Sequence, residues 1–175
     1  INPIDLVVKF GADALRMALV YGVAPGSKIP LSEDKVRGMR NFANKIWNVA
    51  RFVSSLDQHK IEPLDEHTMN GDDTWITDEL DKLIKTVDSA LEKYRFNQAA
   101  EEIYEFTWHK LADIYIERVK DRKEEASPTL RHVLITCLKL LHPFMPFVTE
   151  AVWGEMKYEG QLITAAWPEA SPQSA

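Results

Sequence analysis

Apolar residues recur along most of the chain at intervals of three and four positions, which is the spacing of one face of an α-helix. No segment alternates apolar and polar residues over five or more positions, as a half-buried strand would. Only residues 162–166 favour a short extended piece. The sequence therefore predicts an all-α fold, a helical bundle of four to five long helices with a short helical lead-in.

Capping residues divide the first part of this pattern. Asn2-Pro3 opens a short helix that we expect to end at Gly11, and a second short helix follows over residues 12–21. Ser32 is expected to cap a long helix that runs to about Leu56. These limits place a lead-in at residues 1–30 and the beginning of the bundle at residue 31.

The rest of the bundle follows from the same signals. Residues 57–74 show little periodicity and contain the turn pair Asn70-Gly71, so we expect an irregular connection there. Three helices are predicted over residues 76–91, 96–122 and 127–141, the last opened by Ser127 as its cap. A final helix begins at Pro146. The predicted bundle covers residues 31–170, and residues 171–175 form a frayed tail.

The helix that begins after Ser32 carries an unusual distribution of charge. Its segment 35–56 holds five basic side chains and no acid, although the net charge of the chain is −6. On a helical projection, one stripe is apolar: Met39, Ala43, Ile46, Ala50 and Val53. The opposite stripe is basic and polar: Arg37, Asn41, Asn44, Asn48 and Arg51, with Arg40, Lys45 and Trp47 on its flanks.

This opposite stripe is a candidate binding surface. Asparagine has a lower helix propensity than Glu, Lys or Gln, so three asparagines on a solvent-facing stripe indicate a surface that makes specific contacts. Arginine can pair with phosphate and stack on bases, and an Asn amide can donate to and accept from a base edge. Nucleic acid is the first partner to consider. Two other interpretations stay open: a solvated face, or the counter-charge to an acidic neighbour.

Composition excludes several other classes of function. The acidic net charge restricts nucleic-acid binding to a local surface, and no apolar stretch is long enough to span a membrane. Neither a glycine-rich phosphate loop nor a Cys-x-x-Cys or His-Glu-x-x-His motif occurs. The single Cys137 cannot form an internal disulfide, which favours a reducing compartment. Since the chain begins at Ile1, we expect a piece of a larger protein.

Four segments resemble, in the same order, parts of the class I aminoacyl-tRNA synthetases. Residues 2–16 look like the stretch that follows the Lys-Met-Ser-Lys-Ser loop, and residues 40–53 are similar to the first anticodon-domain helix of the valyl enzymes. Residues 94–100 and 141–147 resemble later helices of the same domain. The loop at 24–28 departs from the valyl pattern, and residues 120–122 look more like the isoleucyl branch.

The resemblance implies a function in tRNA recognition. It indicates a valyl-type domain that binds the anticodon arm of tRNA-Val, with an isoleucyl or leucyl enzyme as the alternative. ATP, Mg²⁺ and the aminoacyl-tRNA ligase chemistry would belong to an upstream catalytic domain in the cytoplasm, and this chain would contain no catalytic residues and no cofactor. The expected tRNA-binding residues are Arg37, Arg40, Asn41, Asn44, Lys45, Asn48 and Arg51. A helical protein–protein interaction bundle is the alternative from another class.

Overall fold

The computed structural model describes residues 2–23, 26–56 and 64–171, and within these ranges it contains helices and turns but no strand. The lead-in consists of α1 (Pro3–Phe10) and α2 (Ala12–Val20), as predicted. The Asn2 side chain accepts a hydrogen bond from the Ile4 N–H at 3.1 Å. Gly11 separates the two helices with a φ of 90°, a conformation that a residue with a Cβ adopts only with strain.

The basic segment forms the predicted long helix, α3 (Glu33–Ser55). Ser32 caps it, because the Ser32 hydroxyl accepts from the Lys35 N–H at 3.2 Å. Its buried stripe is wider than the sequence pattern predicted. Alongside four of the five predicted residues, the core includes three more: Val36, Phe42 and Val49. Ala43 is only half-buried.

The next helix, α4 (Gly71–Glu92), begins earlier than expected. Asn70-Gly71 is therefore not a turn in an irregular connection but a helix start. The Asn70 side chain accepts from the Asp73 N–H at 3.1 Å, and the Asp73 carboxylate accepts from the Asn70 N–H at 3.1 Å. This reciprocal pair is a capping box, with Asp in the place of the usual Glu or Gln. Within the expected connection, Glu66–Thr68 forms a 3₁₀ turn, η1, and residues 57–63 lie outside the described residues.

The predicted helix over residues 96–122 is present, but it is not a regular α-helix. It consists of α5 (Phe96–Glu105), a ten-residue π-helix η2 (Phe106–Tyr115) and α6 (Ile116–Arg118), followed by a 3₁₀ turn η3 (Lys120–Arg122). The wider π turns change which residues face the core. Tyr115 is fully buried, whereas Ile114, expected on the apolar stripe, is 37% exposed.

Two predictions near the C-terminal helices are wrong in detail. Helix α7 (Ser127–Leu141) contains Ser127 as its first residue, and no side chain caps it. The preceding Ala126 already has helical backbone angles, so the extended geometry of a capping serine is absent. Helix α8 (Pro146–Glu155) is followed by a 3₁₀ turn, η4 (Leu162–Thr164), in the segment expected to be extended. The Glu150 carboxylate accepts from the Leu162 N–H at 2.9 Å, which fixes the start of that turn.

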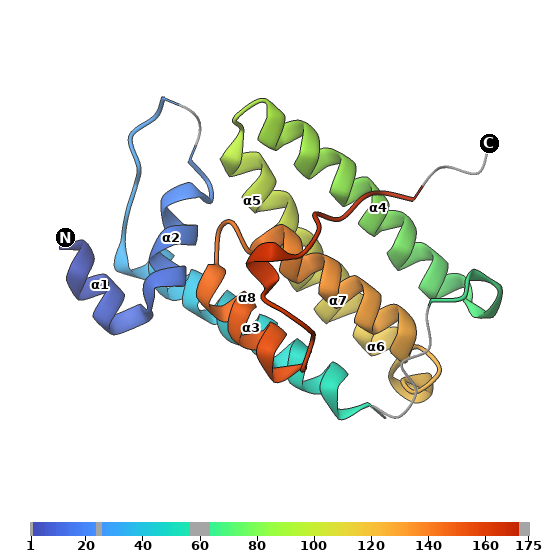
Figure 1. Cartoon of the computed structure of the whole chain (residues 1–175). Coiled ribbons are helices and arrows are strands. Elements are labelled where there is room, and N and C mark those ends of the chain that lie inside the picture. Colours follow the sequence, from blue (N-terminus) through green and yellow to red (C-terminus); the bar gives the residue numbers. More distant parts are fainter. Residues whose placement is uncertain (1, 24–25, 57–63, 172–175) are drawn as a thin grey trace.

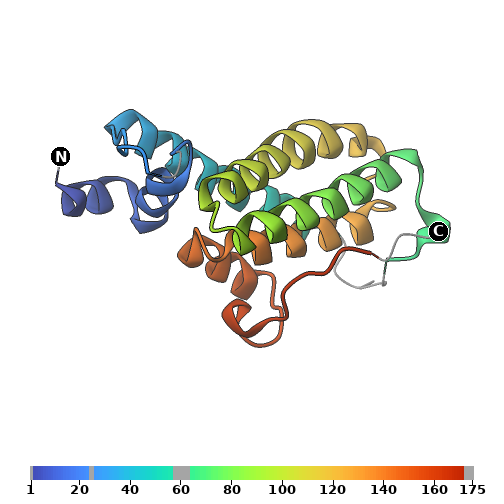
Figure 2. The same cartoon turned by 90° about the horizontal axis from the view of Figure 1, so that it is seen from above.

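The long helices pack around one core, with α7 in contact with α3, α4 and α5. Figures 1 and 2 both place α1 and α2 at one end of the bundle, where α2 contacts α3, α5 and α8. Buried residues of the lead-in, such as Leu6 and Met17, belong to the same cluster as those of the bundle. The lead-in boundary at residue 30 stays a prediction. Of the predicted tail only Ser171 is described, and its N–H donates to the Asp81 carboxylate at 3.1 Å.

Candidate nucleic-acid interface

The structure places the predicted binding residues on one face of α3, directed away from the core. Six of them are exposed and Lys45 is half-buried, since the buried stripe of the helix takes up the opposite side. Their environments differ along the helix, and this difference separates residues that hold the fold from residues available to a partner.

The first two arginines of the face are engaged with the lead-in. The Arg37 guanidinium pairs with the Asp34 carboxylate at 2.5 Å and lies 5.8 Å from the centre of the Phe10 ring. The Arg40 guanidinium donates to the main-chain oxygen of Lys9 at 3.1 Å. Both residues therefore help to hold α1 against α3, a role that the helical projection alone could not show.

Lys45 has an acidic neighbour on η2. Its ammonium lies 2.8 Å from the Asp113 carboxylate and 5.6 Å from the centre of the Trp108 ring. The hydrogen bond from Lys45 holds the pKa of Asp113 below its usual value, despite the opposing effect of burial. For this one residue, the interpretation as a counter-charge to an acidic neighbour agrees with the structure.

Four residues of the face make no such contacts. No hydrogen bond or ion pair within the described part of the chain involves the side chains of Asn41, Asn44, Asn48 or Arg51. The amides and the guanidinium are fully available to an external partner. These four residues are the most accessible part of the predicted site.

A hollow of about 370 Å³ lies between α3 and α8, next to Arg51. Trp47, which is half-buried, lines it together with Arg51, and Glu155 and Lys157 line it from the end of α8. Sequence reasoning missed the α8 side of this hollow, because Lys157 is more than 100 positions away in the chain. In the structure Lys157 follows the end of α8 with a φ of 58°, where glycine is usual. The hollow combines an indole with two cations and one carboxylate, that of Glu155.

A second hollow, of about 440 Å³, lies at the other end of the face. Arg40 and Asn44 line it from α3, Phe10 from α1, and Phe147 from α8. Phe147 is 67% exposed, so this hollow offers an apolar surface beside polar side chains. Asn44 lines this second hollow, and Trp47 and Arg51, on either side of Asn48 in the sequence, line the first.

The described residues show neither a metal site nor a membrane helix. No group of three or more His, Cys, Asp or Glu in the described ranges could hold a metal ion. None of the helices in those ranges is both long enough and apolar enough to cross a membrane.

Comparisons with known proteins agree with this description. Residues 73–175 match the family model described as the anticodon-binding domain of tRNA ligase. The chain is 44% identical to the valine–tRNA ligase of Pseudothermotoga lettingae, over 97% of this chain and 20% of that protein. It is 41% identical to the valine–tRNA ligase of Listeria innocua, over 99% of this chain and 21% of that protein.

A solved structure shares the fold. The LeuRS of Agrobacterium radiobacter K84 agnB2, in a ternary complex with tRNA and LeuAMS, matches with a TM-score of 0.78 and 22% sequence identity. The match covers 97% of this chain and 21% of that one. The chain spans about a fifth of the length of the curated relatives it matches. From its match to the family model over more than half of its residues, the chain belongs to the anticodon-binding domain family of tRNA ligases.

Proposed function

We propose that this chain binds the anticodon arm of tRNA through the outward face of α3, as part of a class I synthetase that charges tRNA-Val. The observation that carries the proposal is the row of available side chains on that face: Asn41, Asn44, Asn48 and Arg51. The relatives that are 41–44% identical are named as valine–tRNA ligases, which supports valine as the amino acid.

The chemistry of these side chains suits an unpaired loop. Anticodon bases can turn outward, so that their edges and faces become accessible to a protein. The asparagine amides would read base edges, while Arg40, Lys45 and Arg51 would contact phosphates. The hollow beside Arg51 would accept a base stacked against Trp47. Arg37 would contribute charge next to the lead-in.

The remaining steps of the reaction belong to the rest of the protein in this proposal. An upstream catalytic domain would bind ATP and Mg²⁺ and would join the bundle through residues 1–30, in the cytoplasm. Arg37 and Arg40 of α3 contact the lead-in residues Phe10 and Lys9. Through these contacts, the lead-in would transmit the position of the bundle to that domain. Two alternatives remain: an isoleucyl or leucyl enzyme, and a helical bundle whose basic face docks an acidic protein.

A binding titration tests the proposal. Anticodon stem-loops of valine, isoleucine and leucine tRNAs are titrated with the chain at low and moderate salt, using the wild type and Asn41→Ala/Asn48→Ala. We expect preference for the valine stem-loop, and a loss of about tenfold or more of that preference in the variant, since each base contact is worth about 1–3 kcal/mol. The phosphate contacts should make binding weaker at the higher salt concentration.

The control variant is Asn97→Ala, which removes a half-buried asparagine on α5, away from the α3 face. Its preference among the three stem-loops should equal that of the wild type. Preference for the isoleucine or leucine stem-loop would replace the valine assignment. Equal binding to all three, unchanged in Asn41→Ala/Asn48→Ala, would refute base reading by α3.

Neutralising Asp113 should strengthen binding at low salt. Asp113→Asn removes the carboxylate that pairs with Lys45, so the ammonium becomes available to phosphate. An exposed pair of this kind contributes about 0.2–1 kcal/mol, so we expect about two- to fivefold tighter binding of the stem-loop and a loss of stability below about 1 kcal/mol. Asp121→Asn, which removes an equal charge from an exposed position on η3, is the control. If both variants bind alike, Lys45 is not part of the interface.

A further inference from the structure

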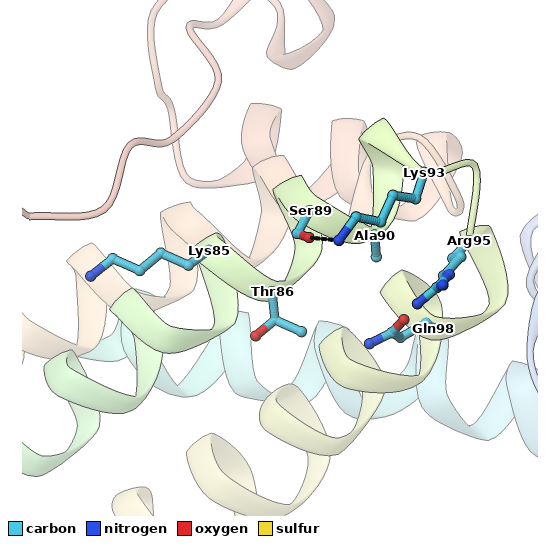
Figure 3. Close-up of a pocket in the computed structure, with 7 residues that line it drawn as sticks. All are labelled: Lys85, Thr86, Ser89, Ala90, Lys93, Arg95 and Gln98. Carbon is cyan, nitrogen blue, oxygen red and sulfur yellow. Dashed lines mark hydrogen bonds between the residues drawn. The ribbon is translucent and has the colours of Figure 1, made fainter.

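A second cationic pocket lies at the corner where α4 turns into α5. Its volume is about 310 Å³. Figure 3 shows the Arg95 and Gln98 side chains close together, the Lys93 ammonium reaching the Ser89 hydroxyl, and the Lys85 side chain pointing away from the others. The lining side chains that can donate hydrogen bonds are Lys85, Thr86, Ser89, Lys93, Arg95 and Gln98.

The charge in this pocket is not neutralised within the chain. None of its lining residues is acidic. Among the described residues no carboxylate pairs with Lys85, Lys93 or Arg95, although Lys82 on the same helix pairs with Glu79 at 2.6 Å. The Lys93 ammonium donates to a neutral acceptor, the Ser89 hydroxyl, at 3.0 Å, and the Thr86 hydroxyl donates to the Lys82 main-chain oxygen at 2.9 Å. Three unpaired cations in a chain of net charge −6 indicate an anionic ligand.

Two exposed aromatic residues flank Arg95 of the pocket in the sequence. Tyr94 is 78% exposed and Phe96 is 47% exposed, and their ring centres are 6.1 Å apart at an angle of 88°. Tyr94 has a φ of 56°, in a turn where the Arg95 N–H donates to the Ala90 oxygen at 2.8 Å. Glycine or asparagine is favoured at this position of a helix end, because a Cβ is strained there. The chain instead places a large aromatic ring in solvent, next to the cations.

We propose that this pocket binds a phosphate group of RNA. Lys93 and Arg95 supply the charge, and the Ser89 hydroxyl and the Gln98 amide supply neutral hydrogen bonds to the phosphate oxygens. Tyr94 stacks on an adjacent base, which favours RNA over free phosphate as the source of the group. The site is separate from the α3 face, since Figure 1 shows the α4–α5 turn at the top of the molecule and α3 along its lower side. The inference does not depend on the anticodon proposal.

Phosphate binding is tested first by nuclear magnetic resonance. Inorganic phosphate is titrated into the chain against chloride at constant ionic strength, and the signals of Ser89 and of the Gln98 side-chain amide are followed. We expect saturable shifts that require about tenfold more phosphate in Lys93→Gln/Arg95→Gln. The control, Lys28→Gln/Lys123→Gln, removes two exposed charges elsewhere and should leave the shifts unchanged. Equal weakening in both double variants, or no phosphate-specific shift in the wild type, would overturn the proposal.

RNA as the source is tested by titrating a short single-stranded oligoribonucleotide into the same variants. Tyr94→Asn suits the left-handed backbone, so it removes the ring without disturbing the turn. We expect it to weaken RNA binding by about fivefold or more and to leave phosphate binding unchanged. Phosphate binding without any effect of Tyr94→Asn on RNA would assign the pocket to a free phosphate and refute the RNA assignment. Displacement of phosphate by oligoglutamate but not by RNA would overturn the proposal in favour of an acidic protein.

The proposal for the α3 face and the proposal for the α4–α5 pocket can be refuted independently of each other. Asn41→Ala/Asn48→Ala changes only the α3 face and should retain the phosphate-dependent shifts of Ser89 and Gln98. Loss of those shifts in that variant would show that the two surfaces are one site and would contradict the inference.

Discussion

Replacing Asp73 with alanine is expected to lower the free energy of unfolding by about 3–5 kcal/mol. Asp73 is 3% exposed, and its carboxylate binds the Arg122 guanidinium through two contacts of 2.8 and 3.0 Å. It also accepts from the Tyr115 hydroxyl and from the Asn70 N–H. Its loss would leave the Tyr115 hydroxyl without this acceptor and Arg122 with only the Asn70 side chain, to which it also donates at 2.7 Å. It would also remove half of the capping box of α4.

Urea unfolding followed by circular dichroism measures this effect. Asp72→Ala is the matched control, because Asp72 is the neighbouring carboxylate in the same helical turn and pairs with Arg118 at 3.2 Å near the surface. That variant should lose less than about 1 kcal/mol. Similar losses in the two variants would mean that the buried network of Asp73 adds nothing beyond a surface pair.

The same carboxylate should make stability depend on pH. Burial alone would raise the pKa of Asp73, but hydrogen bonds from Arg122, Tyr115 and the Asn70 N–H together hold it below its ordinary value of 3.8. A lowered pKa in the folded state gives a stabilisation that is complete above the unfolded pKa and is lost as the pH falls through the folded pKa. Below pH 4 the wild type should therefore lose stability more steeply than Asp73→Ala.

The second large effect is expected at Asp13, where alanine should cost about 2–3 kcal/mol. Asp13 on α2 is 7% exposed, and its carboxylate accepts from the N–H groups of Phe147 at 3.2 Å and Val148 at 2.6 Å. Helix α8 has no cap of its own, since its N-cap residue Met145 makes no side-chain hydrogen bond. Asp13 therefore caps α8 from a distant part of the sequence and holds the lead-in on the bundle.

Hydrogen exchange distinguishes this role from a general loss of stability. In Asp13→Ala the Phe147 and Val148 amides should exchange much faster than the core amides of α7, and global unfolding should also shift. Asp5→Ala removes an exposed acid from α1 and should change neither measurement by more than about 0.5 kcal/mol. Unchanged protection of the two α8 amides in Asp13→Ala would contradict the capping role.

Helix α3 is an element whose limits and buried face could be predicted from the local sequence. Its start at Ser32, its end near Leu56 and the side that faces the core all follow from neighbouring residues, because a cap and a period of 3.6 are local properties. The π-helix in the next long element does not follow in this way. The sequence of Phe106–Tyr115 is equally compatible with an α-helix. In the structure the Tyr115 hydroxyl at the end of this segment donates to the Asp73 carboxylate on α4, a contact that depends on a distant part of the chain.

The features of the candidate site also fall into two groups, those that follow from local sequence and those that depend on distant contacts. The amino-acid pattern alone predicts that the α3 face is basic, rich in asparagine and turned away from the core, since all these residues lie on one helix. Which of these side chains are available to a partner depends on tertiary contacts. Gly11 directs α1 onto Arg37 and Arg40, η2 brings Asp113 to Lys45, and α8 brings Lys157 beside Arg51. These contacts join residues far apart in the chain, and no local period encodes which distant side chains meet.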